Sequence, residues 1–191
     1  MPVAVSVLLL AGCTLGPRPA DDPGTGASPD TAPVEVKILD GVVPALHRDG
    51  RLFTGGQPDR PALVELAALG VATVVNLRTP QEMSDTTKVR YDEAAFVDSL
   101  GLRYVTIPLG GKEYPYTPAA VDSFAAVLGA GRELVFLHCL SGSRAGNLYA
   151  AYLARVRGWP LESAWDRGMA MGMTPLPFAQ MLGADLVPAA R

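Results

Sequence analysis

The residues best suited to catalysis or anion binding form one short stretch, His138-Cys139-Leu140-Ser141-Gly142-Ser143-Arg144. An apolar run at residues 134–137 precedes it and indicates a buried strand, and a periodic apolar segment at residues 145–156 follows and indicates a helix. A tight loop between a strand and a helix aims backbone N–H groups at an anion. A cysteine in such a loop is favoured as the thiolate, and an arginine there offers a planar fork to a tetrahedral oxyanion.

This stretch predicts Cys139 as a nucleophile, with an anion cradle and a positive clamp beside it. Gly142 permits the backbone to turn and to approach a ligand closely. The structural alternative is that Cys139 is a small buried hydrophobe, the commonest role of a lone cysteine after an apolar strand. Because a histidine precedes the cysteine, and a glycine and an arginine follow it closely, we favour the chemical interpretation.

Length and composition restrict the class of protein. The chain has 191 residues, of which 49% are hydrophobic, and a formal net charge of -3. This length fits one domain with extensions, and the apolar content suffices for a core. An acidic chain argues against nucleic-acid binding, so no nucleic-acid partner is predicted. Two cysteines make no disulfide framework and two histidines make no metal-ligand cluster, so we predict neither a metal nor another cofactor.

The amino-terminal stretch predicts export. Residues 3–11 are apolar, too few to span a bilayer, and they run into Leu10-Ala11-Gly12-Cys13. This ending resembles a bacterial lipoprotein signal, which implies cleavage before Cys13 and acylation of that cysteine. The predicted location is therefore the bacterial cell envelope, outside the cytoplasm, with the lipid as the only membrane contact. No Lys or Arg precedes the apolar run, so a cytoplasmic protein is the alternative.

Three regions follow from this interpretation: a signal at residues 1–13, a tether at residues 14–33 and a folded domain at residues 34–191. The tether is rich in Pro and Gly and holds almost nothing large and apolar. In the domain, predicted strands alternate with predicted helices, which indicates an α/β fold with a three-layer, mostly parallel central sheet flanked by helices. Ligands bind at the carboxyl ends of the strands in such sheets. The loops after Leu77 and Ile107 are therefore expected beside the Cys139 loop.

The predicted elements have these bounds. Strands are expected at residues 34–39, 50–54, 71–77, 102–107 and 134–137, and helices at residues 61–69, 91–100, 121–128, 145–156, 160–171 and 175–182. Asp59 is the expected cap of the first helix. Residues 78–82 are expected to begin a polar loop.

Several motifs resemble one family. His138-Cys139-x-x-Gly142 resembles the signature of cysteine-dependent protein tyrosine and dual-specificity phosphatases. Residues 53–58, residues 70–78 with Glu82 after them, and residues 158–164 are similar to small bacterial phosphatase-like domains. Some of those domains stand alone, and others are fused to metallo-β-lactamase-type hydrolases that handle persulfides. The resemblance covers roughly residues 36–173.

The resemblance implies a PTP/DSP-like fold and a hydrolase of phosphate monoesters, of the phosphotyrosine or dual-specificity type. Cys139 would attack phosphorus to form a phosphocysteine, which water then hydrolyses. Arg144 would bind the equatorial oxygens, and the N–H groups of residues 140–144 would complete the cradle. His138 would order the loop through hydrogen bonds. The phosphate-binding loop would thus consist of His138, Leu140, Ser141, Gly142, Ser143 and Arg144 around Cys139.

The chain departs from the phosphatase pattern in two ways. That pattern has five residues between Cys and Arg and a Ser or Thr after the Arg, whereas here four residues intervene and Ala145 follows. Ser141 or Ser143 could replace the missing hydroxyl, and the alternative for each is a turn residue. Phosphatases also carry an Asp general acid on an upstream loop. The loop after residue 107 offers Glu113 instead, which we predict as the acid, with a solvated surface charge as its alternative and Asp85 as a further candidate.

The short loop supports a second hypothesis. Rhodanese-type sulfurtransferases have a similar tight loop, around a cysteine that carries a persulfide, so Cys139 could transfer sulfur. A third hypothesis is an inactive anion-binding scaffold in which Arg144 forms an internal ion pair. The substrate would bear phosphate or sulfur, and the oligomeric state is left open. Gln57, Arg78 and Tyr114 are candidates to line the pocket with Tyr116, and the alternative for Arg78 is a structural pair with Glu82.

Overall fold

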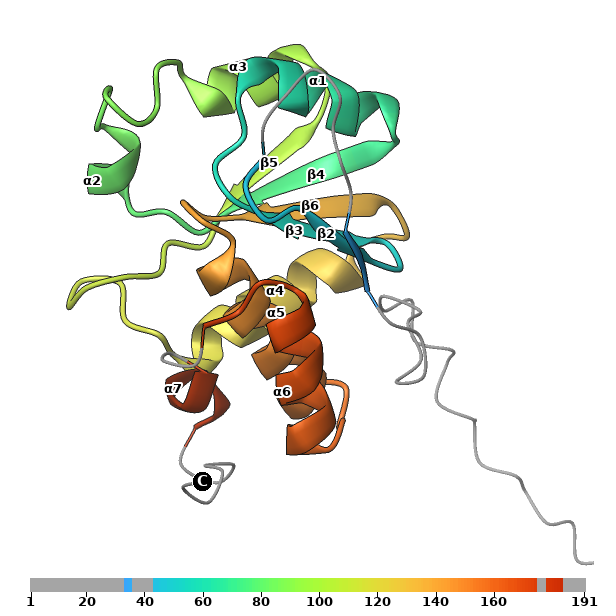
Figure 1. Ribbon diagram of the computed structural model, residues 1–191. Helices are drawn as coiled ribbons and strands as arrows, with labels where there is room; N and C mark the ends of the chain where they lie inside the picture. The colour runs from blue at the N-terminus through green and yellow to red at the C-terminus, as the bar shows by residue number, and fades with distance from the viewer. Residues whose placement is uncertain (1–32, 36–42, 175–177, 184–191) are drawn as a thin grey trace, which may run out of the picture.

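Figure 1 shows a computed structural model, which describes residues 33–35, 43–174 and 178–183. The predicted signal with Cys13, and the predicted tether except for Pro33, lie outside the described residues. Residues 36–39 of the first predicted strand and residues 175–177 of the last predicted helix also lie outside them. The three predicted regions therefore stay predictions.

The described residues form strands and helices in alternation over most of the chain. The strands are β1 (Val34–Glu35), β2 (His47–Asp49), β3 (Leu52–Gly55), β4 (Val71–Asn76), β5 (Arg103–Thr106) and β6 (Leu134–His138). The helices are α1 (Arg60–Ala68), α2 (Pro80–Met83), α3 (Glu93–Ser99), α4 (Pro118–Gly129), α5 (Ser143–Arg155), α6 (Leu161–Ala170) and α7 (Phe178–Leu182).

One sheet organises these elements. In the described part of the chain its strand order is β1-β2-β3-β6-β4-β5, with parallel pairing from β3 to β5 and antiparallel pairing of β1 and β2 at one edge. Helices α1 and α3 cover one face, and α4, α5 and α6 cover the other (Figure 1). The predicted α/β fold with three layers and a mostly parallel sheet is therefore confirmed.

Local sequence signals explain most element ends. Asp59 caps α1 as predicted, because its carboxylate accepts a 2.8 Å hydrogen bond from the amide of Ala62. The polar stretch after β4 was expected as a loop, but it forms the short helix α2. Thr79 and Glu82 start this helix by a capping box, in which each side chain accepts a hydrogen bond from the other residue's amide.

Successive residues of β6 face opposite layers of the fold. Val135, Leu137 and the following Cys139 belong to the core shared with α4 and α5, whereas Phe136 belongs to the core shared with α1 and α3. His138 stacks on Phe136 with ring centroids 5.3 Å apart. Because side chains alternate along a strand, the Cys139 sulfur and the His138 imidazole lie on opposite faces of the sheet.

A buried polar cluster joins α5 and α6 to the antiparallel edge. The hydroxyl of Tyr149 donates a 2.8 Å hydrogen bond to Asp49, and Arg167 forms a 2.5 Å ion pair with the same carboxylate. All three side chains are buried. This cluster gives the buried Asp49 charge the partners that it requires.

Close packing of α5 against the turn after α6 depends on a glycine. A Cβ added to Gly146 would lie 2.7 Å from the amide nitrogen of Met173 and 2.9 Å from the carbonyl oxygen of Met171. We expect Gly146→Ala to lower the free energy of unfolding by about 1–3 kcal/mol, because backbone atoms cannot easily move aside. Urea unfolding measures the change.

Gly129 at the end of α4 is the matched control for that substitution. A Cβ added there would meet no atom within 4 Å, so Gly129→Ala should raise the stability by about 0.5 kcal/mol through its effect on the unfolded chain. Equal stabilities for the two variants would show that the contact at Gly146 is not tight.

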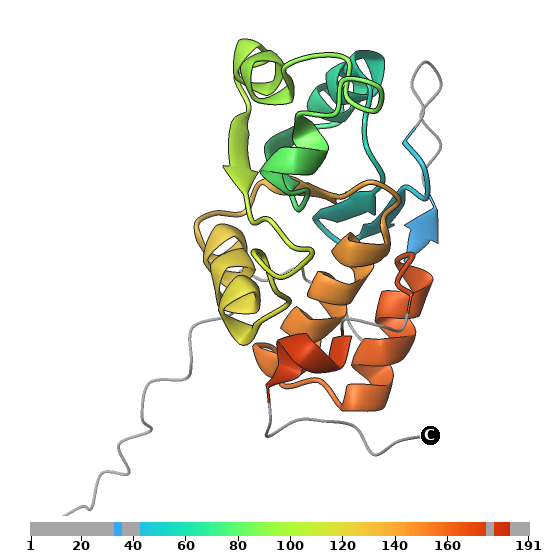
Figure 2. The same ribbon diagram turned by 90° about the vertical axis from the view of Figure 1, so that its left-hand side faces the viewer.

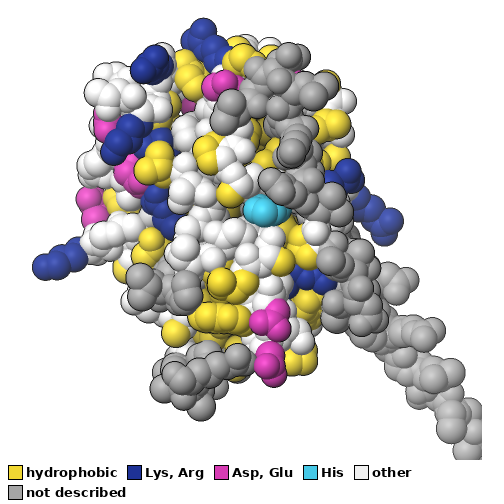
Figure 3. Space-filling model, in the orientation of Figure 1, with side chains coloured by type: hydrophobic (Ala, Val, Ile, Leu, Met, Phe, Trp, Pro, Cys, Tyr) yellow, Lys and Arg dark blue, Asp and Glu magenta, His cyan; other side chains and the backbone are white. Residues whose placement is uncertain are grey.

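The surface in Figure 3 carries basic and acidic side chains interspersed, rather than gathered into a patch of one sign. None of the described helices is long and apolar enough to cross a membrane.

Candidate active site

The predicted loops meet where the parallel strands end, and Figure 2 faces this edge of the sheet. The amide of Cys139 donates to the carbonyl of Gly55 at 3.3 Å, and the amide of Gln57 donates to the carbonyl of Leu140 at 3.1 Å. These two bonds hold the cysteine loop against the chain that follows β3.

The cysteine loop turns tightly into α5. Gly142 has a φ of 93°, which favours glycine, and its amide donates a 3.2 Å hydrogen bond to the sulfur of Cys139. Helix α5 begins at the next residue without a side-chain cap, so its first amides have no partner within the helix. The sulfur therefore faces the positive end of a helix, an environment that favours the thiolate. Cys139 is only 1% exposed, which places the sulfur at the base of the loop.

Arg144 is held rigidly beside this sulfur. Its Nη2 lies 2.6 Å from Oε1 of Glu82 and its Nη1 lies 2.8 Å from Oε2, so the pair is bidentate. Nη1 also donates to the carbonyls of Leu109 at 2.6 Å and Leu77 at 3.4 Å. Arg144 thus contacts both loops that were expected to meet the cysteine loop.

The charges around Arg144 keep it protonated. Burial opposes its charge, but hydrogen bonds to Glu82 and the negative charges of Cys139 and Glu82 raise the pKa of Arg144 above its ordinary value. Its Nε donates to none of the described residues, so this edge of the guanidinium is available to an oxyanion.

Glu82 is ionised at neutral pH. Burial raises its pKa, but hydrogen bonds from Arg144 and the Thr79 amide, together with the charges of Arg144 and Arg78, outweigh burial and lower the pKa from 4.5 to about 2. A carboxylate with this pKa cannot act as a general acid near neutral pH. Glu82 therefore positions Arg144.

We expect Glu82→Gln to lower the stability by about 0.5–1 kcal/mol at pH 7, a value that allows for solvent screening at this partly exposed pair. Because folding lowers the pKa of Glu82, its contribution is present above pH 4.5 and is lost as the pH falls from 4.5 towards 2. Urea unfolding of both proteins at several pH values measures the difference. A difference that grows on acidification would contradict this account.

Other predicted residues lie at the margin of the site. Glu113 is exposed, and its carboxylate accepts a 3.3 Å hydrogen bond from Gln81 of α2. Tyr114 contributes its carbonyl to a 2.6 Å hydrogen bond from Gly110. The pKa of Tyr116 is raised by burial and then, against the effect of Arg144, by the negative charges of Cys139 and Glu82. Tyr116 therefore interacts electrostatically with Arg144, Cys139 and Glu82.

One loop serine bonds a residue outside the loop, and the other is exposed to solvent. The hydroxyls of Ser143 and Thr174 share a 2.5 Å hydrogen bond, and Ser141 is exposed. Asp85 accepts hydrogen bonds from Thr87, which lower the pKa of Asp85. The roles of Glu113 and Asp85 as acids, and of Ser141 or Ser143 as the replacement hydroxyl, stay predictions.

A buried polar network lies on the opposite face of the sheet. Nε2 of His138 lies 2.9 Å from Oε1 of Glu93, and neither side chain is exposed. Glu93 accepts hydrogen bonds from the hydroxyl of Tyr104, at 2.8 Å, and from Gln57. Asn76 in turn donates to the Tyr104 hydroxyl at 2.8 Å.

Two residues predicted to line the pocket belong to this network. Arg78 donates to Gln57 at 2.6 Å and to the carbonyl of Glu82 at 2.9 Å, and its Nε lies 3.8 Å from the Glu82 carboxylate. The structural pairing of Arg78 with Glu82, weighed as the alternative, is therefore present. Sequence reasoning missed Asn76, Tyr104 and Glu93. A polar Asn76 at the end of an apolar strand was the one available signal.

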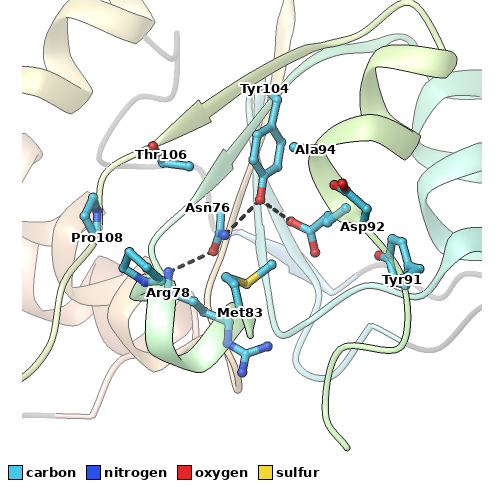
Figure 4. A pocket seen from close by; sticks show the side chains of 11 residues that line it. Asn76, Arg78, Met83, Tyr91, Asp92, Ala94, Tyr104, Thr106 and Pro108 are labelled. Atoms are coloured by element: carbon cyan, nitrogen blue, oxygen red, sulfur yellow. Dashed lines mark hydrogen bonds between the residues drawn. The ribbon is translucent and has the colours of Figure 1, made fainter. Parts of the chain in front are cut away.

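A cavity of about 360 Å³ opens beside this network, between α2, α3 and the ends of β4 and β5 (Figure 4). Its walls include Tyr91, Tyr104, Met83 and Glu93. Burial and the charge of Glu93 raise the pKa of both tyrosines. Neither Cys139 nor Arg144 lines this cavity, so it is distinct from the cysteine site.

Comparison with known proteins assigns the class. The sequence model of a family described as "DSP-PTPase phosphatase fused to NAD+ Kinase" matches residues 28–175. The chain belongs to this phosphatase family and is a PTP-like hydrolase.

Three relatives illustrate the similarity. A "Beta-lactamase hydrolase-like protein" of Xylella fastidiosa (strain Temecula1) is 31% identical over 100 residues, which are 52% of this chain and only 22% of that protein. A DUF442 protein from Shewanella putrefaciens CN-32 is 26% identical with a TM-score of 0.52, covering 68% of this chain and 77% of its own. TpbA of P. aeruginosa is 22% identical with a TM-score of 0.60, and the match covers 83% of this chain and 94% of the TpbA chain.

Proposed function

We propose that the protein hydrolyses phosphate monoesters through a covalent phosphocysteine on Cys139. The observation that carries this proposal is the 3.2 Å hydrogen bond from the Gly142 amide to the Cys139 sulfur, at the uncapped start of α5. The same amides and the free edge of Arg144 can bind the three equatorial oxygens of a phosphoryl group.

The reaction has two steps. The Cys139 thiolate attacks phosphorus, the S–P bond forms, and the P–O bond to the leaving alcohol or phenol breaks with its electron pair on oxygen. Water then attacks phosphorus, the S–P bond breaks, and inorganic phosphate leaves as the thiolate returns. Arg144 stabilises the charge on the phosphoryl oxygens in both steps.

The substrate must reach a deep sulfur. Because Cys139 is 1% exposed, a slender group such as an aryl phosphate fits better than a branched one. A variant of TpbA has been crystallised with pTyr, at 21% identity and a TM-score of 0.56 to this chain. We therefore propose phosphotyrosine-like aryl phosphates as the preferred substrates.

The need to protonate the leaving group tests whether Glu113 is the general acid or a solvated surface charge. If Glu113 is the general acid, Glu113→Gln should lower kcat for an alkyl phosphate by ~10²–10⁴-fold, because an alkoxide leaves poorly without a proton. The same variant should hydrolyse p-nitrophenyl phosphate almost normally, since its leaving group is stable as an anion. Steady-state kinetics on both substrates measure this. If the substitution changed kcat for the two esters equally and only slightly, Glu113 would be a surface charge and not the general acid.

Sulfur transfer is the second candidate function. The four residues between Cys139 and Arg144, one fewer than in the phosphatase pattern, favour it. Here the thiolate would attack the outer sulfur of thiosulfate, form a persulfide on Cys139 and release sulfite.

One panel tests both candidates on the full chain and on Cys139→Ser. Phosphate release from p-nitrophenyl phosphate reports hydrolysis, and intact mass after incubation with thiosulfate reports added sulfur. We expect phosphate release by the wild type alone. Sulfur loading without phosphate release would overturn the phosphatase proposal in favour of sulfur transfer. The absence of both phosphate release and sulfur loading would favour the inactive scaffold.

We also propose that Cys13 carries a lipid that anchors the protein at the bacterial cell envelope. Support comes from the Leu10-Ala11-Gly12-Cys13 ending and the Pro- and Gly-rich stretch after it. Metabolic labelling with a fatty acid in a bacterial host should label the wild type, and Cys13→Ala should stay unlabelled. An unlabelled wild type would favour the cytoplasmic alternative.

A further inference from the structure

We propose that the cavity between α2 and α3 binds a small organic amine, with the ammonium group at Asp92 and an apolar body against the tyrosines of the cavity wall. Neither Cys139 nor Arg144 lines this cavity, so the amine site is separate from the cysteine site. The inference therefore goes beyond the proposed function and does not depend on it.

The cavity has the size and the walls of a small-molecule site. Its volume of about 360 Å³ lies in the range of ligand pockets. Its apolar walls include the rings of Tyr91 and Tyr104, the thioether of Met83 and the rings of Pro80 and Pro108. An apolar ligand body that covers these groups removes their surface and its own from water, which favours binding.

The two ends of the cavity carry different charges. Figure 4 shows Asp92 and Tyr91 at one end, and Arg78 and Pro108 at the other. Asp92 is exposed, and its Oδ1 accepts the 3.0 Å hydrogen bond from the Ala95 amide that caps α3. Its Oδ2 accepts no hydrogen bond from the described residues. A carboxylate oxygen left open at one end of an apolar cavity favours a ligand with a cationic donor at the matching end.

A second carboxylate lies in the wall of the cavity. Glu93 is buried, and it accepts hydrogen bonds from the hydroxyl of Tyr104, at 2.8 Å, and from Gln57. Burial, and then the charge of Glu93, raises the pKa of Tyr91 and of Tyr104, so both tyrosines stay neutral at physiological pH. Neutral tyrosine rings attract cations through their faces, so the walls and the carboxylates favour the same kind of ligand.

The two arginines beside the cavity do not cancel these charges. Arg78 donates to the carbonyl of Glu82 at 2.9 Å, and its Nε lies 3.8 Å from the carboxylate of the same residue, which balances its charge. Arg60 lies over the ring of Tyr91, with its Cζ 5.4 Å from the centroid, but it is exposed and does not line the cavity. Water and salt therefore screen Arg60, and the potential at Asp92 stays negative.

Three probes with the same phenethyl body test the charge of the ligand: phenethylamine, phenethyl alcohol and phenylpropionate, titrated into the full chain by calorimetry at low salt. Phenethylamine should bind about 5-fold more tightly than the alcohol, and phenylpropionate most weakly. Added salt should narrow the difference between amine and alcohol. Equal affinities for these two, or tightest binding of phenylpropionate, would overturn the proposal.

Variants of α3 test the location. Asp92→Asn should remove most of the preference for the amine, while Asn still caps the helix. Asp98→Asn is its control, because Asp98 is exposed and lies outside the cavity. Ala94→Phe should weaken all three probes at least ~10-fold by filling the cavity, whereas Ala95→Phe, at an exposed neighbour outside the lining, should bind them normally. Normal binding by Ala94→Phe would place the amine elsewhere and overturn the proposal.

Vanadate and Cys139→Ser separate this inference from the proposed function. The affinity for phenethylamine should be the same with and without saturating vanadate, and the same in Cys139→Ser as in the wild type. Loss of amine binding in vanadate would place the amine in the cysteine site and overturn the inference. A wild type that binds the amine but does not hydrolyse p-nitrophenyl phosphate would overturn the proposed function alone.

Discussion

Replacing Cys139 by serine should lower phosphate release by at least ~10³–10⁴-fold, because a serine hydroxyl is not ionised by the environment that favours a thiolate. Serine is nearly isosteric with cysteine, and it can accept the hydrogen bond from the Gly142 amide. The fold and the anion cradle should therefore persist. Steady-state hydrolysis of p-nitrophenyl phosphate measures the loss.

Anion binding is the control for this variant. Vanadate or phosphate should bind to Cys139→Ser and raise its Tm, since the amides and Arg144 remain. Residual activity within about 10-fold of the wild type would exclude Cys139 as the nucleophile, because loss of a nucleophile is expected to cost far more.

Replacing Arg144 by lysine should lower kcat/KM by ~10²–10³-fold, although the positive charge remains. The guanidinium spans both oxygens of Glu82 and two carbonyls while its Nε edge stays available, and an ammonium cannot meet all of these partners. The loss should fall on kcat more than on KM, since charge on the phosphoryl oxygens develops in the transition state.

Arg155 provides the matched control on the same helix. It forms an ion pair of 3.3 Å with Asp122 at the exposed end of α5, so Arg155→Lys should change neither activity nor stability measurably. An Arg144→Lys enzyme as active as Arg155→Lys would remove Arg144 from the proposed mechanism.

The strand, loop and helix around Cys139 were predictable because their signal is local. Apolar periodicity changes from β6 to α5 across residues 139–142, and each part could be read without knowledge of the rest. The polar strand β2 was missed because His47-Arg48-Asp49 shows no apolar pattern, and Asp49 is buried only through its contacts with α5 and α6.

The partners of the loop could not be predicted because they come from distant segments. Glu82 stands 62 positions before Arg144, and a sequence offers no sign that the two side chains meet. Glu93 had the features of an ordinary acidic residue in the first turn of a helix. Its burial against His138 follows from the packing of α3 on the sheet, which local patterns do not determine.

The ion pair of Arg144 does not by itself distinguish a phosphatase or a sulfurtransferase from an inactive scaffold. An internal ion pair was expected for the inactive scaffold, and the structure contains one with Glu82. The same pair also orients the guanidinium towards the Cys139 site. The contact that favours catalysis is therefore the one between the Gly142 amide and the sulfur.

Trapping the intermediate tests the central claim most directly. The protein is mixed with p-nitrophenyl phosphate, quenched in acid during turnover and mapped by peptide mass spectrometry. We predict a phosphoryl group on the peptide that contains Cys139, and none on that peptide from Cys139→Ser. Steady phosphate release without any adduct on Cys139, and with full activity in Cys139→Ser, would contradict the account.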